Sequence, residues 1–293
     1  MTAADRTGEL QRYYDRALGD YLRMWSNRDN LAMHLGYWDE HTKDHADSLT
    51  NMNRRMAEAA EVRPGERVLD AGCGAGGTAL WLAEEFGVEV TGYDFAPGQI
   101  DQARTFAARR PAAARVRFEV RDLSDTGAPP GSFDIVWAQE SLCHLTDRPA
   151  FLAEAYRLLA PGGRLVVEDI FATEAALGRA AAERFTAGLE DCAIPPPLPS
   201  RSEWHDWMAA ADFEATRWLD ISAHTAPSYR RLGRLMRINH PLVAGAHLLR
   251  LKSRTQLAMV RGLRAQVAAF EAGWLVPALS VAHKPLQRTK GPA

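Results

Sequence analysis

The sequence has few cysteines and no long apolar run. Its 293 residues include three cysteines, Cys73, Cys143 and Cys192, which are too scattered for a metal cluster or a disulfide framework. Such sparse thiols are typical of a reducing compartment, so we expect a cytoplasmic protein. No stretch approaches the roughly 20 uninterrupted apolar residues of a transmembrane helix. The first residues also lack the basic and apolar run of a signal peptide, so we expect neither a stable membrane span nor export.

Acidic residues are missing from one long segment near the C-terminus. Between Ile221 and Phe270 there is no Asp or Glu. The same segment carries nine basic residues: Arg230, Arg231, Arg234, Arg237, Arg250, Lys252, Arg254, Arg261 and Arg264. Because the whole chain has a net charge of −2, this segregation predicts a local positive potential on an otherwise acidic protein. We expect an anionic ligand there and, lacking a nucleic-acid-binding motif, no nucleic acid.

Hydrophobic residues make up 46% of the chain and charged residues 25%, as in ordinary globular proteins. From about residue 61, strand-like and helix-like segments alternate, which predicts an α/β fold. We expect a Rossmann-like, seven-stranded, mostly parallel sheet with helices on both faces. The expected strands are 67–70, 89–93, 115–120, 133–138, 164–170, 213–221 and 274–283. Two basic helices separated at Pro241 are expected before the last strand.

A glycine-rich loop follows the first expected strand. Gly72, Gly74 and Gly77 satisfy the G-x-G-x-x-G pattern of dinucleotide sites, where glycines let the backbone approach a pyrophosphate. That pattern alone allows an NAD-dependent oxidoreductase. Asp70, however, stands two residues before the first glycine. A carboxylate there would repel a pyrophosphate, but it suits a ligand that carries an ammonium group.

Two further carboxylates follow the next strands. Asp94 ends the second expected strand and can accept hydrogen bonds from both hydroxyls of a ribose. Asp122 follows the third strand and can accept a hydrogen bond from an adenine amino group. Since the carboxyl ends of parallel strands share one edge of a sheet, Asp70, Asp94 and Asp122 are expected to lie near one another. Together they favour an adenosine ligand with an amino group.

These motifs resemble the class I S-adenosylmethionine-dependent methyltransferases from about Val62 to Asp169. The resemblance is carried by Asp70-x-Gly72-Cys73-Gly74-x-Gly76, Asp94, Asp122-Leu123, Phe133-Asp134-x-x-x-Ala138 and Leu158-x-x-Pro161-Gly162-Gly163. Other segments resemble the branch of tocopherol, sterol and natural-product sugar methyltransferases: Tyr14-Asp15, His34-Leu35-Gly36-Tyr37-Trp38 and Gln139-Glu140-Ser141-x-x-His144. Cys143 stands where the sugar O-methylating members often have a second histidine.

The resemblance implies a methyltransferase of small-molecule, secondary metabolism with S-adenosylmethionine as its cofactor. It implies a helical N-terminal lid over residues 1–60 and a methyltransferase domain over 61–293. Within that domain, 61–172 would bind the cofactor, and insertions at about 173–212 and 225–272 would form a substrate cap. A homodimer is one assembly compatible with it. Carried over by position, the cofactor-binding residues are Tyr14, His34, Asp70, Gly72, Gly74, Asp94, Phe95, Gln99, Asp122, Leu123 and Gln139.

Our main interpretation of the reaction is methylation of an isoprenoid diphosphate at carbon. The carbocation intermediate of such a reaction is stabilised by aromatic faces and needs a carboxylate to remove a proton. Glu168 would be that base. The aromatic residues would be Tyr37, Trp38, Trp204, Trp207 and Trp218. The arginines Arg230, Arg234 and Arg237 share one helix face and would bind the diphosphate, with Mg²⁺ as in related isoprenoid enzymes.

Other interpretations remain open. The first is O-methylation of an apolar hydroxylated natural product, with His144 as general base and Asp169 as the group that orients it. Two others come from different classes, an NAD-dependent oxidoreductase and a non-catalytic S-adenosylmethionine-binding protein. Aromatic residues three apart on a helix, as Trp204 and Trp207 are, more often belong to the core. The arginine helices can equally face solvent or lie on an anionic membrane.

Overall fold

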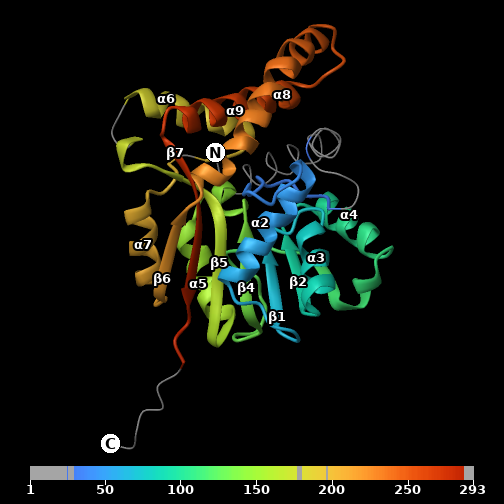
Figure 1. The fold of residues 1–293 in the computed structure, drawn as a ribbon, viewed down its shortest axis with the longest axis vertical. Helices are drawn as coiled ribbons and strands as arrows, with labels where there is room; N and C mark the ends of the chain where they lie inside the picture. Colours follow the sequence, from blue (N-terminus) through green and yellow to red (C-terminus); the bar gives the residue numbers. More distant parts are fainter. Residues whose placement is uncertain (1–24, 26–29, 177–179, 196, 287–293) are drawn as a thin grey trace, which may run out of the picture.

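The computed structural model describes residues 25, 30–176, 180–195 and 197–286. Its centre is one seven-stranded sheet with the strand order β3-β2-β1-β4-β5-β7-β6 (Figure 1). Every strand pair is parallel except those formed by β7, which runs antiparallel to both β5 and β6. The expected fold class is therefore confirmed. The strands are β1 (Arg67–Ala71), β2 (Glu89–Asp94), β3 (Val116–Val120), β4 (Phe133–Gln139), β5 (Leu159–Ala172), β6 (Glu214–Asp220) and β7 (Leu275–His283).

Helices cover both faces of the sheet and one of its edges (Figure 1). The α-helices are α2 (His45–Ala59), α3 (Gly77–Phe86), α4 (Pro97–Ala107), α5 (Arg148–Leu158), α6 (Ala180–Leu189), α7 (Arg201–Ala210), α8 (Ser222–Leu248) and α9 (Arg254–Glu271). Short 3₁₀ turns are η1 (Pro111–Arg115), η2 (Leu142–His144), η3 (Glu174–Ala176) and η4 (Glu190–Cys192). Helices α6, α8 and α9 lie together beyond the carboxyl edge of the parallel strands. Within the described ranges, no helix is both long and apolar enough to cross a membrane.

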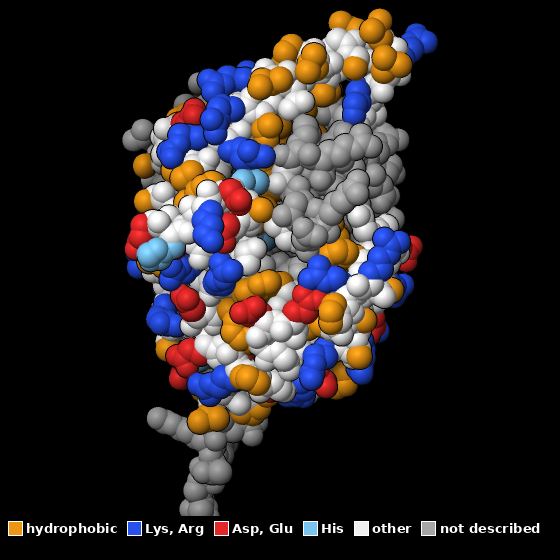
Figure 2. All heavy atoms as spheres, turned by 45° about the vertical axis from the view of Figure 1, so that its right-hand side comes forward, with side chains coloured by type: hydrophobic (Ala, Val, Ile, Leu, Met, Phe, Trp, Pro, Cys, Tyr) orange, Lys and Arg blue, Asp and Glu red, His pale blue; other side chains and the backbone are white. Residues whose placement is uncertain are grey.

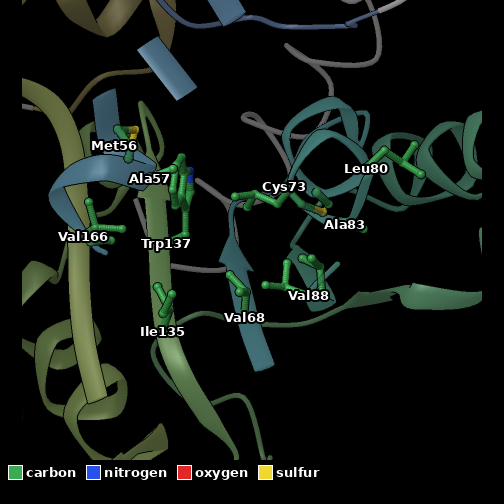
Figure 3. Close-up of a cluster of buried hydrophobic side chains, with 14 of the residues drawn as sticks. Met56, Ala57, Val68, Cys73, Leu80, Ala83, Val88, Ile135, Trp137 and Val166 are labelled. Atoms are coloured by element: carbon green, nitrogen blue, oxygen red, sulfur yellow. The ribbon is translucent and has the colours of Figure 1, made fainter. Parts of the chain in front are cut away.

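Alternation along the strands divides the core into two layers. Val68, Ile135 and Val166 face α2 and α3, where they surround the fully buried Trp137 (Figure 3). The neighbouring residues in each strand point the other way and pack against α5 and α7. Since both faces are covered, the central strands are mostly apolar, and the buried carboxyl groups of Glu168 and Asp169 in β5 are exceptions.

We expected Pro241 to separate the two basic helices, but the helix continues through it. Helix α8 runs through both Pro227 and Pro241 and ends at Leu248. The break comes at Arg250, which adopts a left-handed conformation with φ of 59°. There the Leu251 amide donates to the Ala246 carbonyl at 2.8 Å, which closes the helix end. The terminator is thus a left-handed cap, which needs no proline.

Strand β5 begins five residues earlier than we predicted. The segment Pro161-Gly162-Gly163, which precedes the expected start at residue 164, forms part of this strand. Backbone pairing explains the difference, because the Gly162 amide donates to the Lys284 carbonyl at 3.0 Å and the Lys284 amide donates to Gly163 at 2.8 Å. A contact with the far end of the chain therefore extends the strand.

Candidate active site

A cavity of about 470 Å³ lies at the carboxyl edge of the sheet. Its walls are the loops after β1, β2, β3 and β4, residues 31–34 of the N-terminal segment, and α9. The loops after β1 and β4 flank the point where the strand order reverses, between these two strands. Ligands of open α/β sheets bind at such a switch point, and the volume falls within the roughly 300–1,000 Å³ of small-molecule sites.

The glycine loop after β1 forms the floor of this cavity. Gly72 has a φ of +85°, and a Cβ placed there would lie 2.4 Å from the Cβ of Ser141. A side chain at this position would therefore be both strained and obstructed. The Gly74 amide donates to a carboxylate oxygen of Asp94 at 3.0 Å, which ties the loop to the end of β2. The N-terminal segment lies directly on the loop, because a Cβ at Gly77 would meet the carbonyl oxygen of Asn30.

Two buried carboxyl groups face each other across the loop. Asp70 is 3% exposed, and its Oδ2 has no hydrogen-bond partner among the described residues. Burial and then the neighbouring Asp94 raise the pKa of Asp70 to about 7. Burial raises the pKa of Asp94 to about 6, although the Ala96 and Gly74 amides donate to it. Both carboxyls would become better acids beside a bound cation or hydroxyl donors.

All the expected cofactor-binding residues within the described ranges line this one cavity. They are His34, Asp70, Gly72, Gly74, Asp94, Phe95, Gln99, Asp122, Leu123 and Gln139. Tyr14 lies outside the described residues. Several of their buried polar atoms lack partners among the described residues, namely both amide atoms of Gln99, Nε2 of Gln139 and Nε2 of His34. Burial also lowers the pKa of His34 to about 4, so its ring is neutral at pH 7.

These features fit S-adenosylmethionine. Its amino-acid ammonium suits Asp70, its ribose hydroxyls suit Asp94, and its adenine suits the pocket at Asp122 and Leu123. The orphaned amide groups supply further donors and acceptors for a polar ligand, and the glycine floor permits close backbone approach. No cluster of three or more His, Cys, Asp or Glu side chains that could hold a metal ion occurs in the described part of the chain.

The cavity wall also contains His144. Its Nδ1 lies 2.9 Å from the carbonyl oxygen of Ala193, to which a protonated Nδ1 donates. That tautomer leaves Nε2 as the basic nitrogen. Burial lowers the pKa of His144, so the ring is neutral at pH 7. The surrounding wall is mostly apolar and is formed by Cys143, Ile170, Cys192, Ile194 and Leu263.

We expected Asp169 to orient the His144 ring, but its carboxyl group is hydrogen-bonded to backbone amides. Its Oδ2 accepts hydrogen bonds from the backbone amides of Leu142 at 2.8 Å and Cys143 at 3.0 Å. Its other oxygen accepts from the Ile170 amide at 2.8 Å. The carboxylate is therefore occupied by the η2 turn that carries His144, and it fixes the histidine through the backbone. The Ala193 carbonyl holds the ring instead.

Glu140 belongs to the cavity wall, although we assigned it no role from sequence. It has a φ of 43°, which is unusual for a residue other than glycine and is often found at functional sites. Its carboxyl group accepts a hydrogen bond from the Leu35 amide, and burial raises its pKa to about 8. The residue therefore links the N-terminal segment to the loop after β4.

Glu168 lies behind Glu140 and does not line the cavity. Its side chain is completely buried, and neither carboxyl oxygen has a hydrogen-bond partner among the described residues. Burial, followed by the nearby Glu140, raises its pKa well above the ordinary value. This environment favours the protonated form of the carboxyl group, which makes it poorly placed to accept a proton from a substrate.

Three of the four tryptophans that we expected to contact substrate belong to the core or pack against it: Trp204 is buried, and Trp207 and Trp218 are partly buried. Trp204 donates its indole N–H to Ser280 at 3.1 Å and packs against Phe171, with ring centroids 5.2 Å apart. Trp218 packs on the same phenylalanine, and Trp207 borders this cluster. None of the three lines the cavity. The helix spacing that suggested an aromatic pocket reflects burial against the α5 and α7 face of the sheet.

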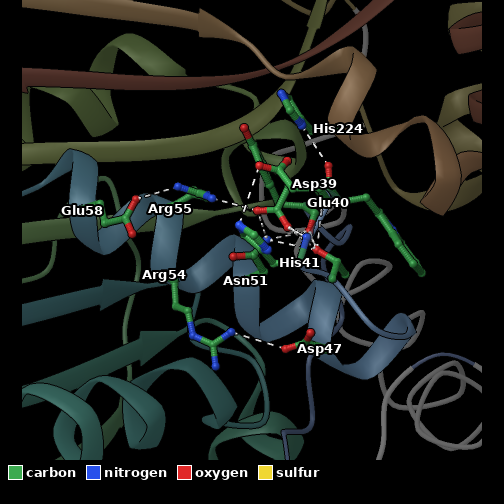
Figure 4. A network of polar contacts seen from close by, with 12 residues as sticks. Asp39, Glu40, His41, Asp47, Asn51, Arg54, Arg55, Glu58 and His224 are labelled. Carbon is green, nitrogen blue, oxygen red and sulfur yellow. Dashed lines mark hydrogen bonds and ion pairs between the residues drawn. The ribbon is translucent and has the colours of Figure 1, made fainter.

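Tyr37 and Trp38 also lie outside the cavity wall. Tyr37 stacks on the ring of His224 at 4.1 Å, and the Trp38 indole donates to Ser228 at 3.0 Å. Next to them, Asp39 accepts hydrogen bonds from Arg55 at 2.7 Å and Asn51 at 2.9 Å (Figure 4). The network fastens the N-terminal segment to α2 and α8. It thereby positions residues 31–34 over the glycine loop after β1.

The arginines are separated from the active-site cavity. Arg230, Arg234 and Arg237 border a second hollow of about 450 Å³ between α8 and α9, together with Arg264 and Glu271. This hollow shares no lining residue with the first cavity. The structure thus does not bring the predicted diphosphate-binding residues together with the predicted cofactor-binding residues.

Replacement of Trp204 by phenylalanine tests the core position of the tryptophans. We expect Trp204→Phe to lower the free energy of unfolding by about 1–2 kcal/mol, because a buried hydrogen bond and part of a ring are lost. Cofactor affinity and turnover should stay within about twofold of the wild type. Denaturant unfolding and cofactor titration measure these effects. A selective loss of substrate affinity would show that the ring contacts substrate.

This chain is similar in sequence to known methyltransferases. The sequence profile described as "Methyltransferase domain" matches residues 69–167. The 27-O-demethylrifamycin SV methyltransferase of Amycolatopsis mediterranei is 34% identical over 226 residues, which cover 76% of this chain and 80% of that protein. The O-methyltransferase resE of Aspergillus sclerotiorum is 27% identical over 228 residues, or 77% of this chain and 82% of that protein.

Among solved structures, geranyl diphosphate C-methyltransferase from Streptomyces coelicolor has the same fold. Its TM-score is 0.71 at 19% sequence identity, and the alignment covers 97% of this chain and 99% of that one. That structure contains Mg²⁺, geranyl diphosphate and S-adenosyl-L-homocysteine. At this level of identity the similarity extends to the fold alone.

Proposed function

The chain belongs to the class I S-adenosylmethionine-dependent methyltransferases of the small-molecule branch, and from this we propose that it methylates a hydroxyl group of an apolar natural product. The observation that carries the proposal is the position of His144. Its imidazole lies in the same cavity as the cofactor-binding residues, surrounded by apolar side chains. A neutral imidazole in such a pocket is suited to remove a hydroxyl proton.

Different residues of the cavity bind the cofactor and accept the proton of the substrate. Bound S-adenosylmethionine supplies a methyl group that is already activated on its sulfonium. Asp70, Asp94 and the glycine loop hold and orient that cofactor. Nε2 of His144 accepts the hydroxyl proton, while the Ala193 carbonyl stabilises the charged ring through Nδ1–H. The apolar wall orients the substrate and excludes water.

Three observations favour this reaction over carbon methylation of a prenyl diphosphate. The expected base Glu168 lies outside the cavity, the expected aromatic residues lie in the core or in the N-terminal network, and the arginines border a separate hollow. Two of the matched relatives also carry names of O-methylating enzymes, the rifamycin enzyme and resE. The proposed substrate is therefore an apolar, hydroxylated secondary metabolite.

The proposal is tested by assaying the protein with S-adenosylmethionine and two panels of acceptors. One panel contains hydroxylated polyketides and phenols, and the other contains geranyl, farnesyl and isopentenyl diphosphates with and without Mg²⁺. We expect methylated products only from the first panel, with the new methyl group on oxygen by NMR. Turnover of a prenyl diphosphate with no activity on any hydroxylated compound would overturn the proposal.

Glu168→Gln separates the two reactions. We expect this variant to retain turnover, because the residue does not line the cavity. It should also stabilise the protein. The pKa of Glu168 is raised in the folded state, so the wild type loses stability as the pH rises above the pKa of a glutamate in the unfolded chain. We expect a rise in Tm of about 2–6 °C near pH 8, with a smaller change near pH 5.

Thermal unfolding at both pH values and an activity assay measure this outcome. Glu89→Gln is a matched control, because it removes an exposed carboxylate from strand β2. Loss of turnover in Glu168→Gln, without loss of folding, would restore Glu168 as the proton acceptor and favour carbon methylation.

A further inference from the structure

The hairpin formed by α8 and α9 ends in an unusually apolar tip. Five of the eight large hydrophobic residues that are exposed in the described ranges occur between residues 238 and 251. We call these five the apolar tip: Ile238, Leu242, Leu248, Leu249 and Leu251, each at least 63% exposed. Ile238, Leu242 and the C-cap residue Leu249 are spaced by four and seven residues, so they continue one stripe from α8 to its end. Five exposed aliphatic side chains in one place indicate an interaction surface.

Basic side chains flank the apolar tip. Arg237 precedes Ile238 on α8, whereas Arg250 and Arg254 follow at the turn and at the start of α9. No ion-pair partner of these three arginines occurs within the part of the chain that the structure describes. The absence of Asp and Glu from 221 to 270 means that no acidic residue of the hairpin lies near the tip, because Glu271 stands at the far end of α9. The partner surface is therefore expected to be anionic.

The shape of the hairpin limits the kind of partner. Its tip projects beyond the rest of the molecule at the side of the carboxyl strand ends (Figure 1). In the space-filling view, hydrophobic side chains cover this end of the molecule and Lys or Arg side chains stand beside them (Figure 2). A projecting apolar tip with basic flanks matches an interfacial membrane element, whose apolar side enters the headgroup region while its cations meet anionic lipids.

We propose that the apolar tip and its flanking arginines dock the protein peripherally on an anionic lipid bilayer. A second copy of the chain suits this surface poorly. In a two-fold symmetric dimer the patch would meet itself, which would bring the arginines of both tips together, while the carboxylate of each hairpin, Glu271, lies at the opposite end of α9 from the tip. The bilayer supplies both the apolar layer and the negative charge. Because α9 also contributes Leu263 and Gln266 to the cavity wall, docking would bring the active site close to a lipid-dissolved substrate.

The test measures sedimentation of the full chain with vesicles. The vesicles contain either phosphatidylcholine alone or equal parts of phosphatidylcholine and phosphatidylglycerol. We expect binding to the anionic vesicles. The affinity for the neutral vesicles should be lower by about tenfold or more. Raising the salt concentration should release the protein, because screening weakens the arginine contribution. Leu242→Ser/Leu249→Ser should weaken binding to anionic vesicles about tenfold or more.

A matched control separates the tip from general surface hydrophobicity. Leu219→Ser/Leu286→Ser also removes two exposed leucines, at positions away from the hairpin, and should bind vesicles like the wild type. The proposal is overturned if the wild type stays in the supernatant with every vesicle, or if both double variants bind equally. It is also overturned if sedimentation velocity shows a dimer that only Leu242→Ser/Leu249→Ser abolishes, without vesicle binding. Activity on a water-soluble acceptor should be unchanged in both variants.

Discussion

Replacement of His144 by alanine is expected to lower turnover by about 10²–10⁴-fold, the range over which general-base catalysis contributes. Affinity for S-adenosylmethionine should stay within about threefold of the wild type, since the cofactor is assigned to other residues of the cavity wall. Steady-state kinetics and cofactor titration by calorimetry measure the two quantities. His41→Ala is the control, because its side chain is 84% exposed and lies outside the cavity.

The pH dependence distinguishes a base from a residue that only shapes the pocket. Burial lowers the pKa of His144, and a general base works in its neutral form. At saturating S-adenosylmethionine, wild-type kcat/KM for the acceptor should therefore be flat above about pH 6.5 on the base limb and fall at lower pH. His144→Gln, which keeps a polar side chain of similar size, should lose both the activity and this limb. A variant that retained the limb would place the titrating base elsewhere.

The sheet could be predicted from the sequence because its signals are local. Alternation of apolar residues and glycine or proline boundaries located all seven strands within a few residues, except for the start of β5. That start depends on backbone pairing between Gly162, Gly163 and Lys284, which are more than 120 residues apart. Likewise, the end of α8 depends on a left-handed cap at Arg250, whereas the obvious breaker Pro241 is tolerated inside the helix.

The cofactor half of the site was predictable for a related reason. Its carboxylates follow consecutive parallel strands, so the fold alone brings Asp70 and Asp94 together. The substrate half is built from segments beyond the resemblance, such as Ile194 and Gln266. Tryptophans at helix spacing are compatible with both a pocket and a core, and only tertiary packing distinguishes the two. For Trp204 the core position follows from its bond to Ser280.

Glu140 shows what additional signal the sequence contained. It lies between Gln139 and Ser141 in a segment that resembles other methyltransferases, directly after an apolar strand. A carboxylate at a strand end on the carboxyl edge is a reasonable candidate for a site residue. Its left-handed conformation and its bond to the Leu35 amide, however, depend on the N-terminal segment and could not be inferred from spacing.

Asp70→Asn is expected to change cofactor affinity and protein stability in opposite directions. The carboxylate faces the part of the cavity where the cofactor's ammonium group would bind. Loss of its charge should weaken S-adenosylmethionine binding about 10–100-fold, as for other charge-assisted hydrogen bonds. In wild-type protein this binding should strengthen as the pH rises through about 7, where the buried Asp70 ionises. The variant should lack that dependence, which calorimetric titration at several pH values measures.

Without cofactor, the same substitution should stabilise the protein at alkaline pH. The folded-state pKa of Asp70 is about 7, above the ordinary 3.8, so the wild type loses stability as the pH rises from about 4 through 7. Asp70→Asn should therefore unfold about 2–6 °C higher than the wild type near pH 8, and at a similar temperature near pH 4. Asp101→Asn is the control, because that carboxylate is 76% exposed on α4. If Asp70→Asn lowered both stability and affinity, Asp70 would be a structural residue and the ammonium would bind elsewhere in the cavity.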